Sequence, residues 1–407
     1  MKLIHTADWH LGKNIEGHSR LEEQRLFLKD FINICEEEQA DIIIIAGDIY
    51  DNYNPSAMAE QLFYDTLKQL SRNGDCMTVV IAGNHDNPER LVASGPLARD
   101  HGIVMAGTPN SVITPGMYGK NEITESDVGY IHAIIHGEEA DILLVHFPSE
   151  KRLNEVYLDE TEEETKKAAS YSEKMSSLFG SLATHFHEDS IHLIASHLFV
   201  MNSVEDGSER SIQLGGSYMV GGEIFPENAD YIALGHIHLP AELAKDRMYY
   251  AGSLEPTDKN DTGKHGYIKG EIKNGRTQTE FIPFASREYV HMEVEAGREM
   301  TGREMKEKIS LAIRERGIQN IYKIILRGFR DPDMIYDTDR MDSYGNIVEI
   351  LDETKPAYDY EKLKKQNAGN LLGWYIESFA EAKDDSVEAI ALAEGVQAML
   401  EAKGSKL

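Results

Sequence analysis

The chain has 407 residues and a formal net charge of −29 at pH 7, and hydrophobic residues make up 41% of it. This apolar content is enough for a large folded core with one or two appended units, and the length exceeds that of one small module. The acidic excess excludes a protein that holds nucleic acid through its overall charge, because phosphate contacts need Lys and Arg side chains.

The sequence predicts a cytoplasmic protein without a membrane-spanning segment. Apolar runs such as Ile42–Ala46 are far shorter than the roughly 20 residues that a transmembrane helix needs. The amino-terminal segment reaches Asp8 before the apolar stretch of a signal peptide develops. Cys35 and Cys76 have neither the spacing of a disulfide framework nor that of a zinc site, which fits a reducing compartment.

Short β-branched runs alternate with amphipathic helical patterns in the first part of the chain, which is typical of a layered α/β fold. Buried strands are predicted at Leu3–Thr6, Ile42–Ala46, Thr78–Ala82, Ile131–Ile135, Ile142–Val145, Ile191–Ala195 and Tyr231–Leu234. One helix is predicted to begin near Ser19, where Ser19 and Glu22 form a candidate capping box. Another is predicted to begin at Asn54 and Pro55. Both helices are expected to cover the sheet.

The pattern predicts three parts along the chain. The first domain is predicted to span residues 1–285. Residues 286–345 have a β-α-β pattern, with a capping box at Thr301 and Glu304, and are predicted to form a small second domain. Residues 346–407 are predicted to form a C-terminal helical segment.

Polar residues that can bind metals follow four of the predicted strands. They are Asp8 and His10, then Gly47 and Asp48, then Gly83, Asn84, His85 and Asp86, and last Gly235, His236 and His238. In an extended backbone, residues two apart point the same way, so an Asp-x-His or His-x-His pair can reach one ion. Each motif alone can be an ordinary turn or exposed loop. The four together, each after an apolar strand, indicate one site beyond the carboxyl ends of the strands.

These donors point to divalent metal ions. Carboxylate, amide and imidazole groups without a thiolate suit Mn, Fe or Zn and argue against copper or an iron–sulfur centre. Two such ions roughly 3.5 to 4 Å apart can hold the attacking and leaving oxygens of a phosphoester during an in-line displacement. A pair of ions needs a bridging carboxylate, and Asp48 is the candidate.

The order of the four motifs resembles the signature of calcineurin-like metallophosphoesterases. Longer strings at His5–Gly12, Gly47–Asp51, Gly83–Leu91 and Asp230–Pro240 are similar to SbcD-type nuclease subunits of double-strand-break repair. The resemblance covers residues 1–285 strongly and the rest more weakly. It implies an α/β fold with a layered metallophosphoesterase core of two β-sheets flanked by helices, a small β-α-β capping domain and C-terminal helices.

By position, the resemblance implies two metal ions that share Asp48. One ion is held by Asp8, His10 and His238, and the other by Asn84, His197 and His236. His85 is then no ligand but a catalytic group that stabilises the developing charge on the phosphate or protonates the leaving oxygen. Asp86 either orients that imidazole or caps the next helix.

One ligand stays open from the local pattern alone, because His146 and His197 both follow an apolar run. The resemblance favours His197, since its surroundings, including Ser208–Arg210, look like the family's segment there. His185 and His187 follow a helical pattern instead, and we expect them at a solvated helix end.

The sequence lacks a phosphate-binding loop of the form Gly-x-x-x-x-Gly-Lys-Ser/Thr, so another chain would supply an ATP site. The resemblance implies an SbcC-type coiled-coil ATPase as that partner, Mn²⁺ as the metal, DNA as the substrate and pairing of nuclease subunits as a homodimer. An apolar stripe suited to docking the ATPase contains Leu371, Leu372, Tyr375, Ile376 and Phe379. Packing of this stripe onto the capping domain is the alternative.

The resulting hypothesis is a two-metal, Mn²⁺-dependent DNA phosphodiesterase, an exonuclease and endonuclease subunit of a DNA repair complex. One alternative is an enzyme that acts on nucleotides or small phosphodiesters, and another is a non-catalytic binding subunit. Four cations near the motifs, which could form a modest basic track for DNA, are Lys13, Arg90, Lys151 and Arg152. Most of the DNA affinity would then come from the ATPase.

Overall fold

The computed structural model describes residues 1–15, 18–108, 111–148, 164–200, 219–257, 261, 263–284, 289–380 and 386–404. The chain forms two compact units, Met1–Glu288 and Tyr289–Leu407. Across these described ranges, no helix is long and apolar enough to cross a membrane.

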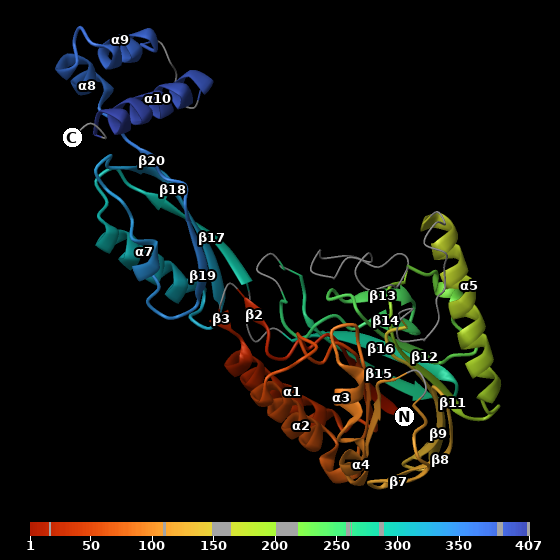
Figure 1. Ribbon diagram of the computed structural model, residues 1–407. Helices are drawn as coiled ribbons and strands as arrows, with labels where there is room; N and C mark the ends of the chain where they lie inside the picture. Colours follow the sequence, from red (N-terminus) through yellow and green to blue (C-terminus); the bar gives the residue numbers. More distant parts are fainter. Residues whose placement is uncertain are drawn as a thin grey trace. The chain divides into compact units, whose positions relative to one another are not determined.

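The first unit contains two β-sheets that face each other, with helices on both outer faces (Figure 1). One sheet has the strand order β16-β15-β1-β4-β5-β6. Its strands are β1 (Lys2–Thr6), β4 (Ile42–Ala46), β5 (Met77–Ile81), β6 (Ile103–Ala106), β15 (Gly266–Lys273) and β16 (Arg276–Pro283). Strands β1, β4, β5 and β6 run parallel, so their carboxyl ends lie along one edge.

The other sheet has the strand order β13-β14-β12-β11-β10-β9-β8-β7. Its strands are β7 (Gly116–Tyr118), β8 (Asn121–Asp127), β9 (Tyr130–Ile135), β10 (Glu138–Val145), β11 (Ile191–His197), β12 (Tyr231–Gly235), β13 (Ala241–Ala244) and β14 (Met248–Tyr250). Strands β10, β11 and β12 are parallel. Two short strands, β2 (Asn14–Ile15) and β3 (His18–Ser19), form a separate pair.

The core explains why the predicted strands are apolar on both sides. In β4, Ile42 and Ile44 face the layer between the sheets, whereas Ile43 and Ile45 face helices α1 (Leu21–Glu38) and α2 (Ala57–Leu70). Helix α5 (Glu164–Leu182) packs on the outer face of the second sheet. Because both faces of the central strands are buried, their residues cannot alternate between polar and apolar types. All seven strands predicted for this unit are confirmed.

The starts of the two covering helices differ from the prediction. The capping box at Ser19 is wrong: the N-cap residue of α1 is Arg20, without a side-chain cap. Arg20 instead forms a buried ion pair with Glu255, 2.9 Å away. Helix α2 begins after Ser56, whose side chain accepts a hydrogen bond from Ala59, rather than after Asn54. Two short helices follow β5, α3 (Pro88–Val92) and α4 (Gly95–Ala98).

The second unit begins with the predicted β-α-β pattern. Strands β17 (Tyr289–Ala296) and β18 (Ile321–Arg330) are parallel, and α7 (Gly302–Arg316) connects them. The capping box of Thr301 and Glu304 is confirmed at the start of α7. Strands β19 (Ile347–Asp352) and β20 (Lys355–Pro356), which were not predicted, also pair with β18. Three helices follow: α8 (Tyr360–Gln366), α9 (Leu371–Ser378) and α10 (Val387–Gly404). The division into a capping domain and a helical segment stays a prediction.

A buried histidine in the first strand should make the stability of the protein depend on pH. The Nδ1 atom of His5 lies 2.9 Å from the Tyr231 hydroxyl, and its Nε2 donates to the Leu234 carbonyl at 3.2 Å. Burial lowers the pKa of His5 from 6.5 to about 3. Between these pH values the unfolded chain binds a proton that the folded chain does not, so this contribution to stability falls as the pH falls.

We therefore expect the substitution His5→Gln to weaken the pH dependence of unfolding in metal-free protein. The loss of stability between pH 6.5 and pH 4.5 should shrink by about 2 kcal/mol relative to the wild type. Urea denaturation at the two pH values measures this difference. The substitution His101→Gln, at a partly exposed site, is the control, and an equal pH dependence in wild type and His5→Gln would contradict the prediction.

Candidate metal centre

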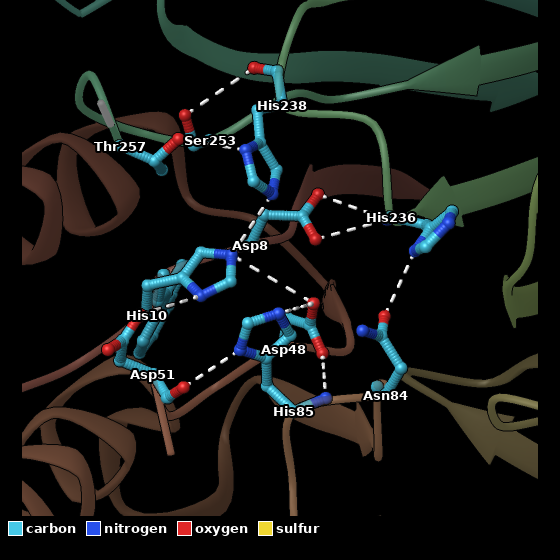
Figure 2. Close-up of polar contacts among 12 residues, drawn as sticks. Asp8, His10, Asp48, Asp51, Asn84, His85, His236, His238, Ser253 and Thr257 are labelled. Atoms are coloured by element: carbon cyan, nitrogen blue, oxygen red, sulfur yellow. Dashed lines mark hydrogen bonds and ion pairs between the residues drawn. The ribbon is translucent and has the colours of Figure 1, made fainter. Parts of the chain in front are cut away.

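Side chains from both sheets meet where the parallel strands end (Figure 2). The loops after β1, β4 and β5 come from one sheet, and the ends of β11 and β12 come from the other. The residues singled out in the sequence all lie here: Asp8, His10, Asp48, Asn84, His85, His197, His236 and His238. The chain thus folds four distant motifs into one cluster.

Three groups of three residues in the cluster have donor atoms within 4.8 Å of one another. One of them is His10, Asp51 and His85, and the other two consist of implied ligands only. Of these two, the first group is Asp8, His10 and His238, and the second is Asp48, His197 and His236. The side-chain oxygen of Asn84 joins the second group, 2.9 Å from Nε2 of His197 and 2.9 Å from Nδ1 of His236. These groups coincide with the two ligand sets that the resemblance implies.

The structure separates the two histidines that the sequence pattern left open. His197 lies within the second group, and its Nε2 is 3.5 Å from a carboxylate oxygen of Asp48. His146 is buried, and its Nδ1 is 3.1 Å from the Phe147 carbonyl. Among the residues that the structure describes, His146 belongs to no cluster of metal-binding groups. The segment Ser208–Arg210, whose resemblance to the family favoured His197, lies outside the described residues.

The backbone is strained at four of the candidate ligands. The φ angle is +54° at Asp8, +46° at His10, +50° at Asp48 and +103° at His236. Non-glycine residues seldom adopt positive φ, and each such conformation costs of order 1–3 kcal/mol. The remaining structure therefore holds these side chains against their own conformational preference, which is typical of functional sites.

The glycines of the motifs permit the close approach of the ligand loops. A Cβ atom on Gly83 would lie 2.1 Å from a carboxylate oxygen of Asp48, and one on Gly235 would lie 1.9 Å from the Ala46 carbonyl. A Cβ atom on Gly47, which has φ of +89°, would lie 2.4 Å from Nδ1 of His197. These positions exclude any side chain, because it would push a candidate ligand out of place.

The hydrogen bonds fix where the imidazole lone pairs point. Nδ1 of His197 donates to the Ala46 carbonyl at 2.8 Å, so its Nε2 faces the oxygens of Asn84 and Asp48 as another acceptor. Likewise, Nε2 of His10 lies 3.1 Å from Nε2 of His238. Acceptors that face one another in a buried site need a cation between them, either a proton or a metal ion.

The pKa values agree with a site that takes positive charge. Burial lowers the pKa of His236 to about 3 and that of His238 well below its usual value, so both imidazoles are in the neutral form that binds metals. Burial also opposes a charged His197, but the Asp48 carboxylate outweighs it and raises the pKa of His197 to about 9. Carboxylate, amide and neutral imidazole donors together fit divalent ions such as Mn²⁺ or Zn²⁺.

His85 lies beside these groups, held by the loop after β4. Its Nδ1 donates to the Asp51 carbonyl at 2.8 Å, and its Nε2 is 4.0 Å from Asp48. The Asp51 contact was not predicted. Asp86 accepts hydrogen bonds from the backbone amides of Ile49, Tyr50 and Gly83, and so ties the second and third motif loops together. The cap of the next helix is Asn87 instead, so the expectation that Asp86 caps it is wrong.

The motif order and this geometry agree with an independent comparison of the sequence. A family model described as calcineurin-like phosphoesterase matches residues 1–240. The chain belongs to this phosphoesterase family. The family predicted from the four motifs is thus confirmed.

The chain is also similar to a bacterial nuclease subunit. It is 41% identical over 255 residues to the SbcD subunit of the nuclease SbcCD from Bacillus subtilis (strain 168). The match covers 62% of this chain and 61% of the relative, so the chain spans less than two thirds of that protein's length.

Two cations of the predicted basic track lie in the described part of the chain, and both are paired with carboxylates. Lys13 forms an ion pair with Asp51 at 3.1 Å. Arg90 forms two hydrogen bonds with Glu60, at 2.6 and 3.0 Å. Two further cations named for the track, Lys151 and Arg152, lie outside the described residues.

A threonine that the sequence analysis missed orients one of the candidate ligands. The hydroxyl of Thr257 lies 2.8 Å from Nδ1 of His238, on the opposite side of the ring from His10. Such outer partners fix the tautomer and orientation of metal-binding histidines, and their loss typically costs 10–100-fold in affinity or activity. The sequence gives no signal for Thr257, because this residue lies beyond β14 and outside the four motifs.

We expect Thr257→Val to weaken metal binding by about 10-fold or more, because the valine keeps the shape but removes the hydroxyl. Titration of metal-free protein with Mn²⁺, followed calorimetrically, measures the affinity. Thr257→Ser retains the hydroxyl and should keep most of the wild-type affinity for Mn²⁺. Equal affinities in the valine and serine variants would show that the hydroxyl has no such role.

Proposed function

We propose that this phosphoesterase hydrolyses DNA phosphodiester bonds with two divalent metal ions, as an exonuclease and endonuclease subunit of an SbcC/SbcD-type repair complex. The convergence of seven candidate ligands from five segments of the chain carries the proposal. One carboxylate, Asp48, lies within reach of histidines in both groups, with oxygen-to-nitrogen distances of 3.5 Å to His197 and 3.9 Å to His10.

In this proposal Asp48 is shared by both ions. One ion is held by Asp8, His10 and His238, and the other by Asn84, His197 and His236. When bound, such ions lower the pKa of water and neutralise charge on the phosphate. Mn²⁺ is the proposed metal, since the mixed oxygen and nitrogen donors suit it.

His85 is the proposed catalytic side chain. Its Nδ1 is held by the Asp51 carbonyl, so Nε2 is the atom left to face the substrate. When Nε2 also carries a proton, an imidazole held in this way can donate that proton to the leaving oxygen or a hydrogen bond to the phosphate. A side chain fixed by packing and a backbone hydrogen bond loses little freedom when it acts.

DNA is the proposed substrate because the relative in Bacillus subtilis is named as part of a nuclease. The net charge of −29, with Lys13 and Arg90 already paired, favours weak DNA binding by this chain alone. An SbcC-type coiled-coil ATPase is therefore proposed to supply most of the DNA contacts, and the nuclease subunits are proposed to pair as a homodimer. We also propose a cytoplasmic location.

The helices near the C-terminus are the proposed docking region for the ATPase. Leu372 and Ile376 of the predicted stripe are buried against α10, together with Leu392 and Val396. Leu371 and Trp374 instead are 68% and 63% exposed. A docking partner would thus contact the outward side of α9, while the inward side holds the small helical core together.

Cleavage of two substrates tests the proposal. The purified chain, with and without the ATPase, is incubated with labelled duplex DNA and with bis-p-nitrophenyl phosphate in Mn²⁺. We expect slow cleavage of both substrates by the chain alone, and a large increase for DNA only when the ATPase is present. Cleavage of the small ester alone, even with the ATPase, would favour an enzyme of small phosphodiesters. No cleavage of either substrate by metal-loaded protein would favour a binding subunit.

A further inference from the structure

A second group of histidines and carboxylates lies on the outer face of the eight-stranded sheet. It is near the amino ends of β10 and β11, whereas the metal centre lies at their carboxyl ends. Glu125 of β8 pairs with His132 of β9, and His132 pairs with Asp141 of β10. Paired residues of neighbouring strands point to the same face, so these side chains form a row across the sheet. His187, between α5 and β11, belongs to the same group, with its ring centroid 4.4 Å from that of His132.

A buried carboxylate organises the group. One oxygen of Asp141 accepts hydrogen bonds from the Tyr130 hydroxyl at 2.6 Å, Nδ1 of His132 at 2.8 Å and Nδ1 of His187 at 3.0 Å. The other oxygen accepts from the backbone amide of His187 and from the Ser190 hydroxyl. Asp141 is fully buried, and these donors satisfy it. His187 follows the helical segment that ends at His185, and its side chain is 42% exposed, as predicted for a solvated helix end. Its contacts with Asp141 were not predicted.

These hydrogen bonds decide the tautomers of both imidazoles. A carboxylate only accepts, so the Nδ1 atoms of His132 and His187 carry the protons. In the neutral rings, both Nε2 atoms then present lone pairs. Nε2 of His132 lies 3.9 Å from a carboxylate oxygen of Glu139, and Nε2 of His187 lies 3.9 Å from one of Glu125. The ring centroids are 4.4 Å apart, so the two imidazoles lie side by side, each with its own carboxylate 3.9 Å from Nε2.

Such an arrangement of acceptors calls for a cation. The separations of 3.9 Å exceed those of hydrogen bonds, which are about 2.7–3.2 Å. They are closer to the separation of two ligands on one tetrahedral zinc ion, roughly 3.4 Å for zinc bonds near 2.1 Å. Glu125 and Glu139 are 62% and 56% exposed, so their side chains can turn toward an ion held by the two imidazoles.

We propose that His132, His187, Glu125 and Glu139 bind a zinc ion, with Asp141 as the carboxylate that orients both imidazoles. A carboxylate behind each histidine is the usual outer partner of zinc-binding imidazoles. Two nitrogen and two oxygen donors complete a closed tetrahedral set, which is typical of structural rather than catalytic zinc. The ion would fasten strands β8, β9 and β10 to the segment that follows α5.

Zinc binding to the full-length chain tests the proposal. Metal-free protein is equilibrated with Zn²⁺ at neutral pH, and the bound zinc is measured by elemental analysis after removal of free ion. The variant Glu125→Gln/Glu139→Gln removes two exposed ligands and leaves the buried hydrogen bonds in place. The control is Glu122→Gln/Glu271→Gln, which makes the same change in charge at two other exposed positions.

We expect the Glu125→Gln/Glu139→Gln variant to bind one equivalent of zinc fewer than the wild type and the control. Its Mn²⁺-dependent cleavage of bis-p-nitrophenyl phosphate should be unchanged, because the metal centre is untouched. A second variant, His187→Gln, should also lose one equivalent. If both variants bind as much zinc as the wild type, the proposal is wrong. The two histidines would then bind protons and no metal ion.

Discussion

The substitution Asp48→Asn should remove both metal ions and nearly all phosphodiesterase activity. The asparagine keeps the size of the side chain but loses the charge that faces histidines of both groups. In the native protein burial alone would raise the pKa of Asp48, but the histidines around it, His197 first, hold it well below its usual range. Asp48 is therefore ionised at neutral pH and available to both ions. We expect activity to fall by roughly 10³-fold, as for other losses of essential electrostatic groups.

Metal content separates this explanation from a simple folding defect. Elemental analysis after equilibration with Mn²⁺ should give two equivalents fewer in Asp48→Asn than in wild type, while thermal unfolding should still show a cooperative transition. Asp65→Asn, an exposed change on α2, is the control and should behave as wild type. Two retained equivalents in Asp48→Asn would refute the bridging role.

The substitution His85→Ala should leave the metals bound but reduce cleavage by about 10²–10⁴-fold, the range of a lost general acid. The backbone amide of residue 85 donates a hydrogen bond to the Asp48 carboxylate at 2.8 Å, and the alanine variant retains this bond. The imidazole itself is 4.0 Å from the carboxylate. The Asp48 geometry should therefore survive the change, and the loss should appear in kcat.

Two measurements sharpen the test of His85. His10, Asp51 and His85 form a further group of potential metal ligands, so loss of an ion from His85→Ala would make His85 a ligand instead. If His85 protonates the leaving oxygen, the defect should be small for a nitrophenolate leaving group and large for an alkoxide. An equal defect for both leaving groups would favour stabilisation of the phosphate charge. His101→Ala is the control, and unchanged cleavage in His85→Ala would refute either role.

The sequence predicted the fold and the site best where short segments determine them. Strand β4 is recognisable because burial on both faces leaves only apolar residues between Ile42 and Ala46. The motifs are recognisable because strained turns and contacts between loops allow few residue types, as at Gly83 and Asp48. Each motif fixes its own geometry, and the parallel strands then bring the motifs together.

Contacts between distant residues account for most of what was missed. Helix α1 begins after Arg20, whose guanidinium pairs with Glu255, and no local pattern indicates such a partner. The same holds for Thr257 behind His238. His187 looked like part of a helix end, yet Asp141, far away in the chain, binds both its ring and its backbone. A single sequence gives no signal for such pairs.

The candidate ligands belong to two different sheets, and this has a mechanical consequence. Asp8, Asp48 and Asn84 follow strands of one sheet, whereas His197 and His236 belong to the other. The distance between the sheets is set by the apolar layer between them and by hydrogen bonds such as that of His197 to the Ala46 carbonyl. Small residues such as Ala195 and Ala233 pack in this layer beside larger Ile, Leu and Val side chains. A bulkier residue at Ala195 or Ala233 would push the sheets apart, so we expect it to weaken metal binding without touching a candidate ligand.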